Sequence, residues 1–229
     1  MIRFSVLSSG SGGNATYVEV DGYGFLLDCG INKKIMTQRL KTINRSISDV
    51  KHIHISHDHT DHIQGIGPHM VVGTFKHFDS DKVKVTNFNL SHDFDCVGFI
   101  VSDNDGNKLA YITDTGYVPE RSIAQLFDCN AILLEFNYDM RSLVNSAYSD
   151  ELQKRIYSAV GHLSNECASD LLKDISHPGL EYVVCLHLSK NSNNPELVRY
   201  EAESGVYEAP SCKVVVAEQD NATPMFTLI

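Results

Sequence analysis

The sequence lacks the features that mark membrane-spanning, secreted and disulfide-stabilised proteins. No stretch approaches the roughly 18 consecutive apolar residues of a membrane helix, and the amino terminus has no charged segment followed by an apolar one. The six cysteines lie far apart without a Cys-x-x-Cys pair, which argues against a disulfide framework. We therefore expect a cytoplasmic protein whose cysteines are reduced and buried.

Positive charge is also scarce. The chain has 19 Lys and Arg residues against 29 Asp and Glu residues, for a formal net charge of −10. Loose, sequence-independent binding to nucleic acid usually needs a surface rich in lysine and arginine that neutralises phosphates. The acidic balance argues against such a basic groove. Any affinity for a phosphate group should therefore come mainly from a source of positive charge other than such a groove.

No proline- or serine-rich linker, low-complexity tract or close repeat divides the 229 residues, so we expect a single domain over residues 1–229. Short runs of β-branched and aromatic residues, separated by turn residues, predict strands. These runs are Ile2–Leu7, Thr16–Val20, Phe25–Leu27, Val50–Ile55, Val83–Phe88, Val97–Val101, Lys108–Ile112, Ala131–Phe136, Tyr182–Leu188 and Val214–Ala217. Helices are predicted at Pro119–Phe127 and Ser164–Ile175. The pattern indicates an α/β fold of two packed sheets with helices outside.

Five potential metal ligands stand within six positions directly after a predicted strand. They are His57, Asp58, His59, Asp61 and His62. Such a cluster would repel itself without cations, and imidazole combined with carboxylate suits zinc, manganese or iron. In a tight loop, His57 and His59 could face one ion while Asp61 and His62 face a second. The alternative is a polar surface turn that is rich in His and Asp.

Other conspicuous residues have simpler interpretations. The segment Ser9–Gly13 is rich in glycine but lacks the Lys-Ser/Thr of a P-loop, so we expect a tight turn near the site, with contact to a phosphate as the alternative. His52 and His54 alternate with isoleucines and are expected to face away from the apolar side of their strand as structural residues. His69, His77 and His177 have no motif around them and are expected in loops or at the surface.

The segment His-x-His-x-Asp-His after an apolar strand resembles the signature of the metallo-β-lactamase superfamily. Four more segments resemble motifs of that family, in the family's order. They are Phe25–Gly30, Leu90–His92, Tyr111–Gly116 and Cys185–Ser189. Within the superfamily the chain resembles the YycJ/WalJ group through four further segments: Leu7–Ala15, Gly161–Glu166, His187–Asn191 and Asn194–Leu197. The resemblance implies the αββα sandwich, with two mixed β-sheets flanked by helices.

The resemblance also implies a site with two divalent metal ions, zinc or manganese, and assigns their ligands. The first ion takes His57, His59 and His92, the second takes Asp61, His62 and His187, and Asp114 lies between them. Asp28 would brace the metal-binding loop without touching an ion. Such an ion pair activates water for attack on phosphorus.

Members of the YycJ/WalJ group are described as exonuclease-like enzymes on DNA. The resemblance therefore implies a metal-dependent phosphodiesterase or nuclease that acts on DNA ends or short, single-stranded oligonucleotides. His162 would protonate the leaving group, and Glu135 would orient the His162 imidazole. Asp61 is a third catalytic candidate. His162 as a further metal ligand or a helix cap is the alternative. Asn14, Asn191 and Asn194 are weaker candidates for contact with substrate, since each also fits a turn or helix position.

Two other functions stay open at this point. The chain has no obvious glycine-rich basic arm like the one with which ribonuclease Z holds transfer RNA. This absence and the acidic balance would suit a small-molecule phosphodiesterase, such as one that opens a cyclic nucleotide. A lactonase, thioesterase or lactamase is the third option, because this fold hosts all of these activities. The chain departs from the group at Tyr138, where histidine is usual, and at Asp93–Cys96, which lacks the usual Ala and Pro. The oligomeric state is open, with a homodimer as one option.

Overall fold

The computed structural model describes residues 1–68, 70–74 and 78–228, and the chain falls into two units. Unit 1 comprises Met1–Asn87, Phe99–Leu109 and Ala217–Ile229, and unit 2 comprises Phe88–Gly98 and Ala110–Val216. Each unit is described by itself. The expectation of one domain over residues 1–229 stays a prediction.

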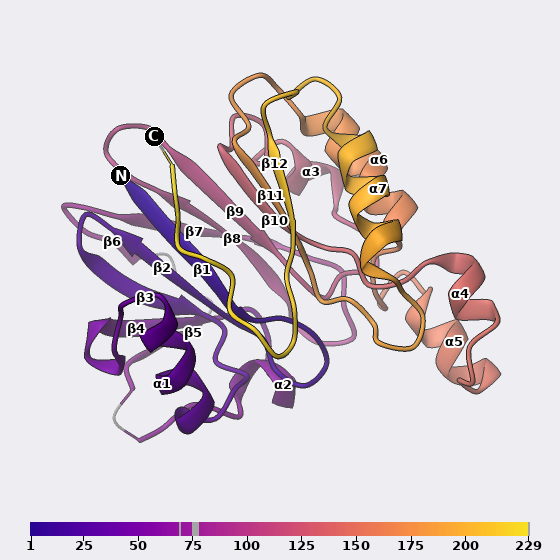
Figure 1. Cartoon of the computed structure of the whole chain (residues 1–229), viewed down its shortest axis with the longest axis horizontal. Coiled ribbons are helices and arrows are strands. Elements are labelled where there is room, and N and C mark those ends of the chain that lie inside the picture. The colour runs from indigo at the N-terminus through magenta and orange to yellow at the C-terminus, as the bar shows by residue number, and fades with distance from the viewer. Residues whose placement is uncertain (69, 75–77, 229) are drawn as a thin grey trace. The chain divides into compact units, whose positions relative to one another are not determined.

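Unit 1 contains a six-stranded mixed sheet with the order β13-β1-β2-β3-β4-β5 (Figure 1). Its strands are β1 (Ile2–Ser8), β2 (Ala15–Val20), β3 (Tyr23–Leu27), β4 (Val50–Ile55), β5 (Val72–Thr74) and β13 (Phe226–Thr227). The first three are antiparallel, and β4 and β5 continue parallel to β3. The tight turn from β2 to β3 uses Asp21 and Gly22, whose positive φ angles of 48° and 81° suit a two-residue hairpin loop.

The first helix, α1 (Lys33–Thr42), flanks this sheet and was not predicted from the sequence. Its amino-terminal cap is Asn32, whose side chain accepts a hydrogen bond from the Ile35 amide at 3.0 Å. The helix buries Met36 and Leu40 in an apolar cluster with residues of β3 and β4. The connection between β3 and β4 contains α1 and the short 3₁₀ helix η1 (Ile47–Asp49). Helix α2 (Thr60–Ile63) follows β4.

Strand β4 lies between β3 and β5, and both of its faces are buried from His52 to Ile55. His52 and His54 are buried structural residues, and the isoleucines that alternate with them pack in a separate apolar cluster, but the histidine side of the strand is apolar as well. Their rings lie among aromatic side chains, with His52 stacked on Phe25 at a centroid distance of 5.0 Å and His54 5.5 Å from Phe99. The period-two pattern alone did not show that a second apolar layer covers this side.

The second sheet has seven strands in the order β12-β11-β10-β9-β8-β7-β6. They are β6 (Phe78–Asp79), β7 (Lys84–Asn89), β8 (Val97–Ser102), β9 (Lys108–Ile112), β10 (Ala131–Glu135), β11 (Tyr182–Leu186) and β12 (Lys213–Val216). The predicted class of two mixed β-sheets flanked by helices is confirmed, and the ten predicted strands are present within two residues at either end. The predicted helix at Pro119–Phe127 is shorter, since α3 spans Glu120–Ile123.

In unit 2, strands β10, β11 and β12 are parallel. Helices provide the crossovers between them: α4 (Met140–Val144), α5 (Asp150–Ile156) and α6 (Asn165–Ile175) precede β11, and α7 (Pro195–Gly205) precedes β12. Helices α6 and α7 run side by side (Figure 1), where Gly205 has too little space for a side chain beside Leu172. Parallel strands end at the same edge, so residues that follow β10 and β11 lie near each other.

The structure also tests the smaller expectations. No helix in the described part of the chain is long and apolar enough to cross a membrane. All six cysteines are free thiols; four are buried, Cys212 is half-buried, and Cys167 is exposed, so the expectation of burial is wrong for Cys167. His69 and His77 lie outside the described residues. His177 lies in the loop after α6, where its Nε2 is 3.1 Å from the Cys129 carbonyl oxygen.

Candidate metal centre

Unit 1 contains the ligand-rich loop that connects β4 to α2. His57 and His62 are fully buried and their ring centroids are 4.2 Å apart. The Nε2 atom of His57 lies 2.9 Å from Nδ1 of His59. The His62 amide donates to the His59 carbonyl at 2.9 Å, which closes the loop into the first turn of α2. The sequence-predicted ligands of this loop are thus gathered in one place.

Asp28 braces this loop from the end of β3. Its Oδ1 accepts a hydrogen bond from the Ser56 amide at 2.8 Å, and its Oδ2 lies 2.9 Å from Ser56 Oγ and 2.7 Å from His62 Nδ1. A carboxylate at Nδ1 fixes the ring orientation and places Nε2 as the ligand atom of His62. Asp28 adopts a positive φ of 60°, an uncommon backbone conformation that other contacts must hold. Ser56 was not singled out from the sequence.

Asn14 connects the glycine-rich turn to the same loop. Its Oδ1 accepts from the Gly10 amide at 2.9 Å, and its Nδ2 lies 3.2 Å from Asp61 Oδ2 and 3.0 Å from His62 Nε2. Asn14 is only 2% exposed, so its side chain serves the loop more than an open surface. The absence of a side chain at Gly30 lets the ligand loop approach closely, because a β-carbon at Gly30 would collide with the Asp61 carbonyl.

Unit 2 contains a cluster of two carboxylates and two imidazoles. Asp114 follows β9, Glu135 ends β10, His187 follows β11, and His162 stands ahead of α6. One ligand atom from each of these four side chains lies within 4.8 Å of the others. Asp114 Oδ1 is 2.7 Å from His187 Nδ1 and 3.2 Å from His162 Nδ1. Four segments far apart in the sequence therefore meet here.

Glu135 is the central anion of this cluster. Its Oε1 lies 2.8 Å from His162 Nδ1 and 3.0 Å from His187 Nδ1, and its Oε2 accepts from the amides of Thr115 and Leu163 at 2.9 and 3.1 Å. Burial would raise the pKa of Glu135, but the neighbouring His162 and these hydrogen bonds lower it overall. These contacts favour the ionised form of Glu135, although it is fully buried.

The same contacts act on His162. Burial would lower its pKa, but the charge of Glu135 and hydrogen bonds to Asp114 and Glu135 raise the pKa to about 9. The side chain is 22% exposed, so its outer edge is accessible. The cap of helix α6 is Ser164, whose Oγ accepts from the Cys167 amide at 3.1 Å. A helix-capping role for His162 is therefore wrong.

Asn137 is a residue of the site that the sequence analysis missed. Its side-chain amide donates to the His187 carbonyl at 2.9 Å and lies 3.3 Å from His187 Nδ1. Its backbone amide donates to Leu163 and its carbonyl accepts from Ser189, at 3.0 and 2.9 Å. His187 has a positive φ of 54°, and Asp114 one of 50°. Asn137 thus holds the strained His187 segment against the His162 segment.

His92 lies next to this cluster. Its Nδ1 is 3.0 Å from the Gly161 carbonyl oxygen, and its ring centroid is 5.5 Å from that of His162. A hydrogen bond at Nδ1 leaves Nε2 as the ligand atom. Burial lowers the pKa of His92, which favours the neutral ring that coordinates metals.

The weaker substrate candidates have local roles. Asn194 caps α7, with its Oδ1 2.8 Å from the Glu196 amide. Asn191 Nδ2 donates to the Tyr148 hydroxyl at 3.0 Å. A contact of either residue with substrate stays a prediction.

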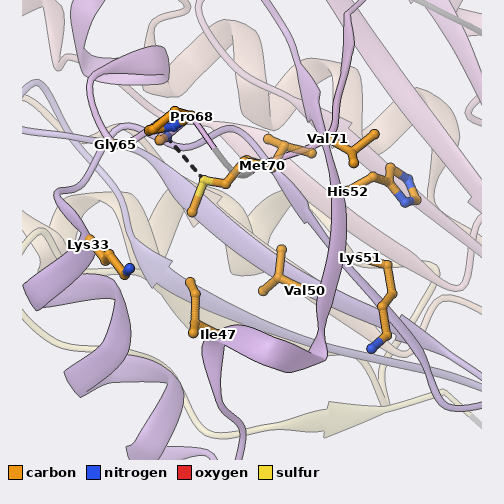
Figure 2. A pocket seen from close by; sticks show the side chains of 11 residues that line it. Lys33, Ile47, Val50, Lys51, His52, Gly65, Pro68, Met70 and Val71 are labelled. Carbon is orange, nitrogen blue, oxygen red and sulfur yellow. Dashed lines mark hydrogen bonds between the residues drawn. The ribbon is translucent and has the colours of Figure 1, made fainter.

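A cavity of about 280 Å³ in unit 1 contains none of the expected site residues. Figure 2 shows the side chains of Ile47, Val50 and Met70 between Lys33 and Lys51. The Gly67 amide lies 3.4 Å from the Met70 sulfur. This cavity therefore does not mark the metal centre.

The residues present fit a metal centre of the transition-metal type. Each unit offers imidazole nitrogens and carboxylate oxygens that are buried or half-buried and close together, and this donor set suits zinc or manganese. Carboxylates at the Nδ1 atoms of His62 and His187 orient both rings, as is usual for metal-binding histidines.

Comparison with known proteins places the chain. The family model described as a beta-lactamase superfamily domain matches residues 70–187, and the model of the anti-Pycsar protein Apyc1 matches residues 10–88. Exodeoxyribonuclease YycJ of Bacillus anthracis is 33% identical, over 86% of both chains. The chain belongs to the metallo-β-lactamase superfamily. Within this superfamily it belongs to the YycJ/WalJ group, as the resemblance implied.

Other relatives agree with this membership. Exodeoxyribonuclease WalJ of Streptococcus pneumoniae is 30% identical over 97% of both chains. Among solved structures, the metallo-β-lactamase fold protein YhfI from Bacillus subtilis has a TM-score of 0.71 at 16% identity, covering 97% of this chain and 98% of that chain. At 16% identity, this structural likeness supports the fold of this metallo-β-lactamase family member alone.

Proposed function

We propose that this protein is a metal-dependent phosphodiesterase that acts as an exonuclease on DNA ends or short oligonucleotides. The observation that carries the proposal is the hydrogen bond between His162 and Glu135 beside Asp114. Cleavage of a phosphodiester expels an alkoxide, which leaves poorly unless it is protonated, and a held imidazolium can supply that proton. Relatives named exodeoxyribonucleases favour DNA as the substrate.

The metal ligands are part of the proposal. We assign two divalent ions, zinc or manganese, to the ligands that the family likeness provides: His57, His59, His92, Asp61, His62, His187 and the shared Asp114. When bound, such a pair supplies a hydroxide nucleophile and stabilises negative charge on the phosphate. The side chains of Asp28 and Asn137 then keep His62 and His187 in the orientation that binding requires.

His162 acts as the general acid, and Glu135 positions it. Glu135 holds Nδ1 of His162 at 2.8 Å, so the opposite edge of the ring, with Nε2, can donate a proton to the leaving oxygen. The raised pKa keeps the ring protonated at neutral pH. Glu135 is itself fixed by the Thr115 and Leu163 amides, which limits its movement.

His162→Ala tests this assignment. We expect both metals to stay bound, while hydrolysis of single-stranded DNA falls by about 10² to 10⁴. Much of the loss should disappear with bis(p-nitrophenyl) phosphate, whose leaving group needs no proton. His177→Ala is the matched control, because His177 bonds the Cys129 carbonyl and is not part of the cluster. Loss of a metal ion in His162→Ala would instead make His162 a ligand, and equal damage on both substrates would rule out proton donation.

A substrate panel separates the alternatives. Purified protein with manganese or zinc is incubated with single-stranded DNA, short RNA, cyclic mononucleotides and a lactone. We expect DNA to be cleaved fastest. Cleavage of cyclic nucleotides with DNA left intact would establish a small-molecule phosphodiesterase, and a dominant rate on the lactone would establish a non-phosphate hydrolase.

A cytoplasmic location is also proposed, because six free thiols suit a reducing compartment. The homodimer stays a prediction that light scattering on the purified protein would test.

A further inference from the structure

A second cavity, of about 350 Å³, lies in unit 2 and contains a proposed metal ligand. His92 lines it, together with Phe94, Asp95, Tyr117 and Arg121. This volume is near the lower end of the range for small-molecule sites and is large enough for a group of nucleoside size.

Two aromatic side chains of this cavity are exposed to solvent. Phe94 is 52% exposed and Tyr117 is 50% exposed. Burying a large aromatic ring is favourable, so two half-exposed rings in one hollow indicate a surface that a ligand covers. Phe94 also stands in the Asp93–Cys96 segment, where the chain departs from its group. Neither ring is required by the motifs of the metal site.

Hydrogen bonds fix the two aromatic segments relative to each other. The Ser91 amide donates to Thr115 Oγ1 at 3.1 Å, and the Gly116 amide donates to the Ser91 carbonyl at 2.9 Å. The Thr115 hydroxyl also donates to the Tyr117 carbonyl at 2.6 Å. Phe94 follows His92 by two residues and Tyr117 follows Asp114 by three. The rings are therefore carried on the same two segments that hold proposed metal ligands.

We propose that this cavity is a nucleobase subsite in which an unpaired base of the substrate stacks on Phe94 and Tyr117. The proposal rests on the proposed nuclease function and names single-stranded DNA ends as the substrate class. Aromatic stacking binds any base through its π-face and needs no positive charge, which suits a chain with net charge −10. A base inside a duplex is already stacked on its neighbours and must first be unpaired.

The charges in the cavity agree with a nucleotide ligand. Arg121 can contact a phosphate or stack on a base, and Asp95 can accept a hydrogen bond from an exocyclic amino group. Because His92 lines the same hollow, a nucleotide whose base lies there has its phosphate close to a residue of the proposed metal centre.

Paired substrates test the subsite. Each assay compares a single-stranded oligonucleotide with one whose two terminal nucleotides carry tetrahydrofuran in place of the base, at the 5′ end or at the 3′ end. Phe94→Ala and Tyr117→Ala should each lower kcat/KM on the base-bearing DNA by roughly 5- to 100-fold. On the abasic DNA, both variants should have nearly the same kcat/KM as the wild type has on that DNA. Phe94→Trp and Tyr117→Phe, which keep a ring, should retain activity on both.

Tyr200→Ala is the matched control, since Tyr200 is 67% exposed on α7 and does not line the cavity. Equal losses on base-bearing and abasic DNA, or no loss on either, would overturn the subsite while leaving the nuclease function intact. If the wild type cleaves no phosphodiester, the proposed function fails, and binding of a 2-aminopurine oligonucleotide to metal-free protein is measured instead. Weaker binding in both alanine variants supports the subsite, and unchanged binding refutes it.

Discussion

Acidification should destabilise unit 1 through the two buried histidines of β4. The Nε2 atoms of His52 and His54 lie 2.7 Å apart, and the Tyr23 hydroxyl lies 3.1 Å from His52 Nδ1. One ring must donate and the other accept in the bond between them, so the two rings cannot both be protonated. Burial lowers the pKa of His52 to about 4, and burial and the neighbouring His52 lower that of His54 to about 3.

The size of the effect follows from these values. In the unfolded chain each histidine titrates near 6.5, so between about pH 7 and pH 5 the unfolded state gains protons that the folded state refuses. The free energy of unfolding should then fall by about 2 kcal/mol for each histidine, or about 4 kcal/mol for the pair. This contribution is fully present above neutral pH and is lost as the pH falls toward the folded-state values. It is a large part of a typical stability of about 5 to 15 kcal/mol.

Urea unfolding of metal-free protein at the two pH values measures this loss. The comparison is with the double variant His52→Phe, His54→Leu, which removes both rings so that neither is left without its partner. All other histidines titrate in both proteins, so the difference between their losses in free energy of unfolding reports on His52 and His54 alone. We expect the variant to lose about 4 kcal/mol less than the wild type on acidification. Equal losses in the two proteins would mean that the rings charge inside the folded state, and would refute the reasoning.

Three further predictions concern the metal site and its chemistry. Elemental analysis of protein purified without chelator should find about two metal ions per chain, and Asp61→Ala should reduce this to about one; fewer than about 0.2 ions in the wild type after manganese or zinc is supplied would contradict the metallohydrolase assignment. Asn137→Ala should weaken metal binding by about 10- to 100-fold in a chelator competition, because His187 loses its anchor, whereas an unchanged affinity would give Asn137 no positioning role. Phosphodiesters should be hydrolysed faster than carboxylic esters and lactams, and a lactam turned over about a hundredfold faster would overturn the substrate class.

Much of the fold and part of the site could be predicted because their signals are local. Each predicted strand is a run of β-branched and aromatic residues, and a period-two pattern indicates a strand without knowledge of its partner. The ligand loop was equally accessible, because His57, His59, Asp61 and His62 are close in sequence. Helix α1 was missed because Met36 and Leu40 form too narrow an apolar stripe to stand out.

The remaining features depend on residues that only folding brings together. Asn137 contacts the His187 segment across 50 residues of sequence, and Glu135 contacts His162 across 27. Local sequence does not encode which distant carbonyl an amide will meet. The burial of both faces of β4 likewise depends on its central place in a sheet and on aromatic residues from other strands. Local patterns thus determined the strands and the ligand loop, whereas the orientation of each ligand was decided by packing between distant segments.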